Sequence, residues 1–170
     1  MKFVSLGRTG ILVTPVGMGV LTVGRTQLDL PLREGADIVR HALARGIRFF
    51  DTAQYYETYS YIREGIRLWR EEDGGDGGKG AKTPAPVIAS KSLTHSYSGM
   101  AEAVEEMRRS LDLDVVDIFL LHEVRTGGDF AARAGAWECL NDLKAKGVVR
   151  AIGLSTHYVD VAGQNAVIAE

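Results

Sequence analysis

Four residues suited to proton transfer follow successive strand-like segments of the chain. Asp51 and Tyr56 come after the run IRFF, Lys91 follows PVIAS, and His122 follows VVDIFLL. Because the carboxyl ends of parallel strands meet at one rim, we expect these four side chains, the tetrad, to lie together. A cation, an anion, a phenol and an imidazole at one rim can deliver a proton to a carbonyl. The sequence therefore predicts carbonyl reduction.

The chemistry assigns each member of the tetrad a role. Hydride arriving at a carbonyl carbon builds negative charge on the oxygen, which needs a proton donor within about 2.6–3.2 Å. Tyr56 is the expected donor, and the cation of Lys91 is expected to lower its pKa from about 10 toward neutral pH. Asp51 would hold Lys91 charged, and His122 would orient or polarise the carbonyl. None of the four binds a metal in this scheme.

Each of these residues, taken alone, also has a structural explanation. Asp51 could cap a turn, and Lys91 could be a surface lysine. His122 could be a satisfied core histidine, and Tyr56 could lie at the rim with its hydroxyl in water. Their joint occurrence at one predicted rim favours a catalytic set over four coincidences.

Short β-branched or aromatic runs alternate with longer amphipathic segments, which is the pattern of βαβ units. Before the first unit, a hairpin is expected around residues 8–10. The last residues, 161–170, resemble a sixth helical segment. The expected strands are 13–20, 47–53, 86–90, 115–121 and 148–155. Helices are expected over about 33–45, 59–70 and 132–146, and a further helix is expected to start near Ser98 as its N-cap.

Two folds accommodate this alternation, an open doubly wound sheet and a closed barrel. Polar residues follow each successive strand, which favours the barrel, because the binding site of an open sheet lies at a single switch point. The Gly17-Met18-Gly19 run lacks the third glycine and the acidic residue of a dinucleotide fingerprint. Eight units take about 250 residues, so 170 supply about five. The predicted fold class is α/β, a (β/α)8 TIM-barrel type truncated to about five units, with residues 1–170 as one domain and 71–86 as a flexible glycine-rich loop.

Composition restricts the function classes. The chain is 45% hydrophobic and 25% charged with a net charge of −2, which predicts a globular protein without a nucleic-acid surface. We find neither the apolar segment of about 7–15 residues that a signal peptide needs nor a membrane span, so a cytoplasmic location without membrane association is expected. Cys139 is the only cysteine, so redox chemistry requires a bound cofactor.

The motifs LGRTG, FFDTAQYY, VIASK, DIFLLH and AIGLSTH occur in the order and at the spacing typical of the aldo-keto reductases, and the chain resembles that family. The resemblance implies that the tetrad is catalytic. It also implies that Ser155 and Thr156 contact the nicotinamide carboxamide of NADPH or NADH, with NADPH favoured, although the family usually has Ser-Asn there. His157 either lines the site or is an exposed loop histidine.

Two functions of different class remain open from the sequence. The first is an NAD(P)H-dependent oxidoreductase that reduces a small-molecule aldehyde or ketone to an alcohol, with tyrosine as general acid. The second is an incomplete fragment or a barrel-derived binding module that keeps the tetrad but does not hold cofactor. An incomplete parallel sheet has two open edges, so self-association through the first and fifth strands is also expected.

Overall fold

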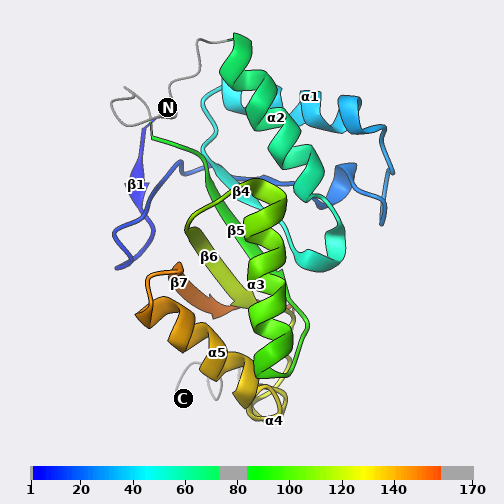
Figure 1. Ribbon diagram of the computed structural model, residues 1–170. Coiled ribbons are helices and arrows are strands. Elements are labelled where there is room, and N and C mark those ends of the chain that lie inside the picture. The colour runs from blue at the N-terminus through cyan, green and yellow to red at the C-terminus, as the bar shows by residue number, and fades with distance from the viewer. Residues whose placement is uncertain (1, 73–83, 158–170) are drawn as a thin grey trace.

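The computed structural model describes residues 2–72 and 84–157 (Figure 1). Five parallel strands form one sheet in the order β3-β4-β5-β6-β7, and β1 pairs with β2 in an antiparallel hairpin. The strands are β1 (Val4–Ser5), β2 (Leu12–Val13), β3 (Met18–Gly19), β4 (Phe49–Asp51), β5 (Val87–Ser92), β6 (Val116–Leu121) and β7 (Val149–Leu154). The helices are α1 (Leu32–Ala44), α2 (Tyr59–Glu72), α3 (Tyr97–Leu111), α4 (Gly127–Ala131) and α5 (Ala134–Ala145), with the 3-10 turns η1 (Leu21–Val23) and η2 (Gln54–Tyr56).

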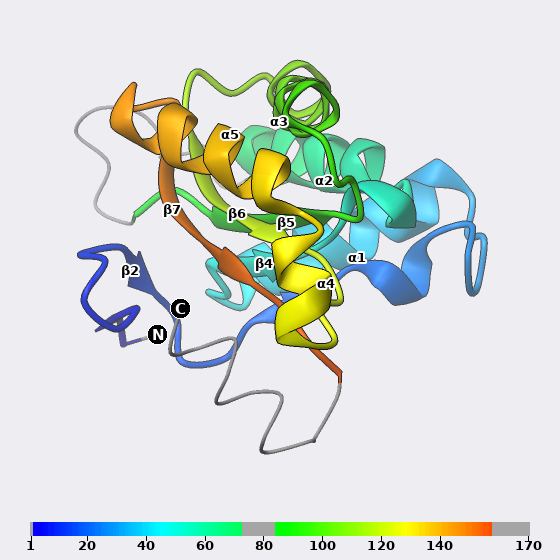
Figure 2. The same cartoon turned by 90° about the horizontal axis from the view of Figure 1, so that it is seen from below.

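Helices and hairpin cover opposite faces of the sheet. Figure 2 shows α1, α2, α3 and α5 along one face, with the β1–β2 hairpin on the other. The helices cover the larger apolar cluster, which contains Phe50 and Phe119. The opposite face, which we call the inner face, is formed by Val87, Ala89, Ile118 and Ala151 of the sheet. Ile11 and Val13 pack against it. Both faces of the sheet are therefore apolar, as expected for parallel strands.

The alternation of side chains along a strand determines which residues can reach the inner face. In β5 and β6, Ala89 and Ile118 lie in the inner cluster, whereas Ile88 and Phe119 lie in the outer one. Successive residues of a strand point to opposite faces, so residues two or four positions further on return to the same face. Each tetrad residue that ends or follows a strand lies at such an even spacing from an inner apolar residue. The sequence thus directs these side chains to the inner face.

Helices α1 and α2 come close together at Gly65, which has no side chain. A Cβ on Gly65 of α2 would lie 2.6 Å from the Cβ of Val39 and 2.8 Å from the carbonyl oxygen of Ala36 in α1. Contacts this short are not tolerated, so Gly65 permits the close approach. The pair fixes the position of η2, which precedes α2 and carries Tyr56.

Three predicted boundaries are corrected by the structure. The segment 13–20 is not one strand, because Pro15 lacks a backbone donor and the Thr14 hydroxyl bonds Val16 O and the backbone N of Arg48 instead. The N-cap of α3 is Ser96 rather than Ser98, since its Oγ accepts a bond from the backbone N of Gly99 at 3.1 Å. The helix expected over 132–146 begins at 134, after the separate helix α4.

The other elements agree with the sequence. The hairpin around residues 8–10 and the parallel order of the five strands are as predicted. Of the loop expected over 71–86, the first two residues belong to α2, and 73–83 lie outside the described residues, as does the expected segment 161–170. In the described part of the chain, no helix combines the length and apolarity needed to cross a bilayer.

Candidate active site

A buried ion pair joins the first two strands of the site. Lys91, at the end of β5, is 6% exposed, and its Nζ lies 2.7 Å from Oδ1 of Asp51 at the end of β4. The same ammonium donates to the carbonyl oxygen of Thr52 at 2.6 Å. Burying an unpaired lysine is costly, so this pairing is what allows a lysine at this position. Asp51 thus lies where its predicted role as the partner of Lys91 requires.

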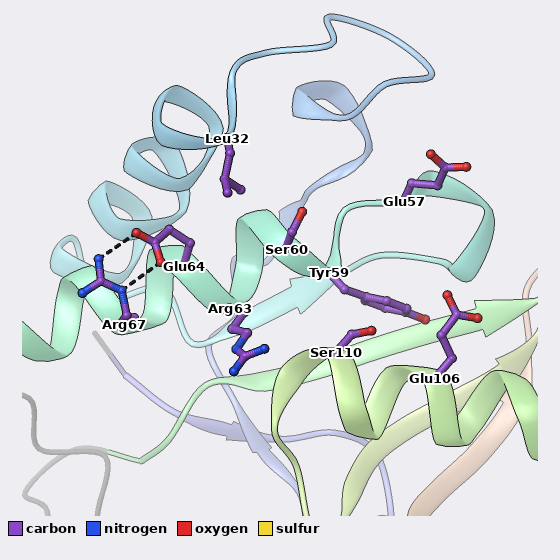
Figure 3. A pocket seen from close by; sticks show the side chains of 9 residues that line it. All are labelled: Leu32, Glu57, Tyr59, Ser60, Arg63, Glu64, Arg67, Glu106 and Ser110. Atoms are coloured by element: carbon purple, nitrogen blue, oxygen red, sulfur yellow. Dashed lines mark hydrogen bonds and ion pairs between the residues drawn. The ribbon is translucent and has the colours of Figure 1, made fainter.

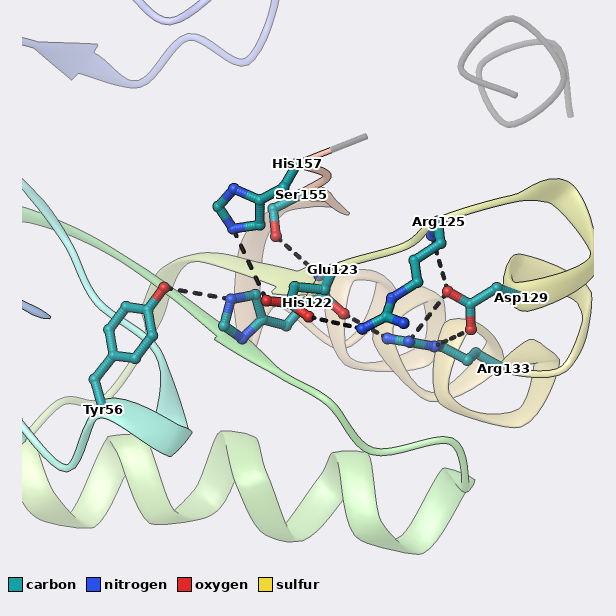
Figure 4. Close-up of polar contacts among 8 residues, drawn as sticks. All are labelled: Tyr56, His122, Glu123, Arg125, Asp129, Arg133, Ser155 and His157. Atoms are coloured by element: carbon teal, nitrogen blue, oxygen red, sulfur yellow. Dashed lines mark hydrogen bonds and ion pairs between the residues drawn. The ribbon is translucent and has the colours of Figure 1, made fainter. Parts of the chain in front are cut away.

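Tyr56 and His122 meet on the other side of this pair. Tyr56 lies in η2, and its hydroxyl is 3.3 Å from Nε2 of His122, with the two rings edge to face at 5.5 Å (Figure 4). The Nζ of Lys91 lies 5.2 Å from the centre of the Tyr56 ring. The fold therefore brings all four tetrad residues, separated by up to 71 positions in the sequence, to one rim of the inner face.

The protonation states of this pair suit a donor beside a neutral imidazole. Burial raises the pKa of Tyr56 above its usual value, and the carboxylates of Asp51 and Glu123 raise it further. Burial lowers the pKa of His122, with the charge of Lys91 acting in the same direction. The expected lowering of the Tyr56 pKa by Lys91 is thus not found. The Lys91 charge is directed at the Asp51 carboxylate, and Tyr56 remains a phenol that holds its proton at neutral pH.

His122 is held through its backbone. Its N–H donates to the carbonyl oxygen of Ser92 at 2.9 Å, and its carbonyl oxygen accepts from Nη1 of Arg133 at 2.5 Å. Arg133 is 5% exposed and forms two further bonds to Asp129, at 3.0 and 3.2 Å. The Nδ1 of His122 is buried and has no hydrogen-bond partner among the described residues. The imidazole is thus positioned from its main chain, and Nε2 is the nitrogen that faces the site.

The loop after β6 is fastened to the end of β7. Ser155, one of the two residues implied for cofactor contact, accepts a bond from the backbone N of Glu123 at 3.2 Å. Its backbone N donates to Leu121 O, and its carbonyl oxygen accepts from the backbone N of Val124, both at 2.8 Å. Ser155 therefore lies beside the tetrad at the same rim. Thr156, the second implied residue, follows it and is exposed.

Sequence reasoning missed three residues of this site. Thr52 contributes a backbone carbonyl, which no side-chain pattern reveals. Glu123 directly follows His122, but its left-handed conformation, with φ of 55°, has no signal in an ordinary residue. The buried Arg133 had one available signal, the four-residue spacing from Asp129 that brings the pair together.

A separate hollow lies between α2 and α3. This groove of about 650 Å³ contains none of the tetrad residues, and Figure 3 shows the side chains that line it. Its Arg67 is paired with Glu64 at 2.7 Å and with Glu71. Burial raises the pKa of Tyr59, which bonds Ser90 at 2.7 Å, to about 12, so it stays a phenol. The groove therefore has neither a free anion-binding arginine at Arg67 nor a reactive phenol.

Comparison with known proteins identifies the family. The sequence profile described as the Aldo/keto reductase family matches residues 15–165. The chain belongs to this family. Its predicted fold class is confirmed, because solved aldo-keto reductases superpose on the five parallel strands and their helices. An aldo-keto reductase from Pseudomonas aeruginosa has a TM-score of 0.75 and 28% identity over 99% of this chain and 64% of its own.

Two further relatives show the range of the family. The chain is 29% identical to the L-galactose dehydrogenase of Arabidopsis thaliana, over 92% of this chain and 49% of that protein. A structure of the Bombyx mori aldo-keto reductase in complex with NADP has a TM-score of 0.68 at 21% identity, covering 90% of this chain and 50% of its own, and supports the fold alone. The chain spans about half the length of the curated relatives it matches.

Proposed function

We propose that this chain carries the catalytic rim of an NAD(P)H-dependent oxidoreductase that reduces an aldehyde or ketone to an alcohol. The observation that carries the proposal is the Tyr56 hydroxyl 3.3 Å from Nε2 of His122, beside the 2.7 Å Lys91–Asp51 pair. A donor and a polarising group placed side by side can both reach one carbonyl oxygen.

Each tetrad residue then has a defined task. The Tyr56 hydroxyl transfers its proton to the carbonyl oxygen as negative charge develops there. His122, neutral and with Nε2 toward the site, donates a hydrogen bond to the same oxygen when Nε2 carries its proton. Asp51 holds Lys91 charged and in place, and the Lys91 ammonium, 5.2 Å from the centre of the Tyr56 ring, attracts the negative charge that develops on Tyr56 during transfer.

The described residues fit the nicotinamide end of the cofactor. A bound nicotinamide supplies the hydride. Within the described residues the Ser155 hydroxyl accepts one bond and donates none, so its proton is available to a carboxamide oxygen. Thr156 follows at the exposed end of the same strand connection. We assign these two residues to the carboxamide and favour NADPH, as the membership of the Aldo/keto reductase family suggests.

The substrate is proposed to be a small carbonyl compound. The tetrad demands only a carbonyl oxygen that reaches both Tyr56 and His122. One relative is named for L-galactose, a hydroxylated sugar, and a sugar-derived carbonyl is therefore the first compound class to assay.

The deciding experiment measures NADPH oxidation by the purified protein against a panel of aldehydes, ketones and aldoses. We expect turnover that disappears in the Tyr56→Phe variant. Equal turnover in the wild type and this variant, or none with any carbonyl compound despite bound NADPH, would refute the proposal.

The alternative function is a binding module that keeps the tetrad without holding cofactor. The share of each relative that the chain covers, 49% for the Arabidopsis thaliana enzyme, favours this alternative for the 170-residue chain on its own. A fluorescence titration of NADPH with the purified 170-residue chain separates the two. Saturable micromolar binding supports the enzyme, and no binding supports the module.

A further inference from the structure

Three side chains with metal-ligand chemistry converge beside Tyr56. They are His122, Glu123 and His157, and one donor atom from each lies within 4.8 Å of the other two. Nε2 of His157 lies 4.0 Å from Oε1 of Glu123, and Figure 4 shows all three side chains gathered at the end of β6 and β7. Two imidazoles and one carboxylate form a ligand set typical of zinc and other first-row transition metals.

The backbone holds two of these ligands in place independently of any ion. His122 is 3% exposed and is fixed through its backbone by Ser92 and Arg133. Glu123 adopts the left-handed conformation, with φ of 55°, which is unfavourable for a residue other than glycine. Its N–H bond to Ser155 maintains that conformation. Such conformations cluster at functional sites, and here this one accompanies a carboxylate that lies between two histidines.

We propose that His122, Glu123 and His157 bind a divalent zinc-class ion, with the fourth position open toward Tyr56. Bonds of about 2.0–2.2 Å place the donors of a tetrahedral zinc site roughly 3.3–3.5 Å apart. The three donors must therefore move closer, and His157, with a side chain 70% exposed, is able to move. Arg125 lies 3.5 Å from Oε2 of Glu123, which leaves Oε1 facing His157.

The buried environment of His122 sets the strength of the site. Nε2 faces Tyr56 and is the nitrogen that would bind the metal. The other nitrogen, Nδ1, has no hydrogen-bond partner among the described residues, so no second residue orients the imidazole from that side. Loss of such a partner typically weakens metal binding about 10–100-fold. We expect micromolar rather than nanomolar affinity, a range suited to reversible occupation.

Occupation would oppose carbonyl reduction, a consequence that rests on the function proposed above. An ion on Nε2 of His122 removes the hydrogen bond to Tyr56 and occupies the nitrogen that meets the carbonyl oxygen. The ion thus acts as a reversible inhibitor that a chelator removes.

Titration of the untagged, purified protein with Zn²⁺ in competition with a chromophoric chelator tests the site without any turnover. We expect one ion per chain, and an affinity lowered at least about tenfold in both His157→Ala and Glu123→Gln. His41→Ala, which removes an exposed histidine on α1, is the matched control and should change the affinity less than about twofold. Unchanged affinity in the first two variants, or no binding by the wild type, would overturn the proposal.

A Co²⁺ titration followed by visible absorption provides a second readout. Tetrahedral coordination by nitrogen and oxygen should give an absorption that His157→Ala abolishes, and a spectrum retained in that variant would place the ion elsewhere. If the protein binds the ion as expected but reduces no carbonyl compound, the metal site stands and the proposed function fails. If Zn²⁺ is bound at this site and turnover is unaffected, the inhibitory role is refuted.

Discussion

At the residue scale, the proposed proton donor and the charged ammonium are separate groups with different partners. Tyr56 keeps its proton because burial and two carboxylates disfavour the phenolate. Lys91 is occupied by Asp51 and by the carbonyl of Thr52. The cation therefore does not ionise the resting phenol.

Replacing Tyr56 by phenylalanine tests the donor directly. We expect turnover to fall at least about 10²-fold, because the lost hydroxyl acts mainly in the transition state. Affinity for NADPH should remain nearly unchanged. Steady-state kinetics and a cofactor titration measure both quantities. The neighbouring Tyr55 is 64% exposed, and Tyr55→Phe is the matched control. If Tyr55→Phe lost its activity while Tyr56→Phe kept it, the assignment of the proton donor to Tyr56 would be wrong.

At the scale of elements, the break between α4 and α5 positions the imidazole. Arg133 lies in this break, where it reaches both the Asp129 carboxylate and the backbone carbonyl of His122. A continuous helix over 132–146, as the sequence predicted, has no such break. The interruption thus connects the helical layer to the site.

We predict that Arg133→Met destabilises the protein by about 3–5 kcal/mol, since it leaves a largely buried carboxylate and a carbonyl without their partner. Chemical denaturation measures this loss. Because Arg133 acts on the site only through His122, kcat should fall in a folded Arg133→Lys variant while the KM for NADPH stays close to that of the wild type. A KM effect without a kcat effect in Arg133→Lys would contradict the positioning role.

The same ion pair predicts how stability depends on pH. Burial alone raises the pKa of Asp129, but the N–H of Arg125 and the guanidinium of Arg133 outweigh it and lower the pKa below its usual value. The carboxylate therefore stabilises the fold above the unfolded pKa of about 3.9, and that contribution is lost as pH falls through the lower folded value. Unfolding measured from pH 7 to pH 2 should show the wild type losing its advantage over Asp129→Asn below about pH 4. If the difference in the free energy of unfolding between the wild type and Asp129→Asn stayed constant across this range, the ionisation of Asp129 would not contribute to stability.

These elements also show which features the sequence contains. The strands follow from continuous apolar runs, and the meeting of Asp51 and Lys91 at one rim follows from their places at the ends of successive runs, both of which sequence reasoning detects. The interruption at Pro15 and the break at Arg133 depend on contacts with residues distant in the chain, such as Arg48 and His122. The conformation of Glu123 depends on Ser155, 32 positions away. Long-range backbone contacts of this kind leave no periodic pattern, and they account for the parts of the site that could not be predicted.

At the scale of the whole molecule, the described sheet ends in β3 on one side and β7 on the other. Parallel strands with exposed edges carry unpaired backbone donors and acceptors that can pair with another chain. We predict that the isolated 170-residue chain self-associates through these edges. Sedimentation velocity over a concentration series measures this. A monodisperse monomer at all concentrations would contradict the prediction.

The two apolar faces of the sheet have a consequence for how the chain can change. In β5, Lys91 lies two residues after the inner Ala89, and in β6, His122 lies four residues after the inner Ile118. Deletion of a single residue from either strand would reverse this parity and turn the charged or imidazole side chain into the apolar layer under the helices. Length changes in pairs would preserve it. The rim of the proposed site therefore depends on even and odd positions within the strands, whereas a change of length in a connecting loop leaves that parity unchanged.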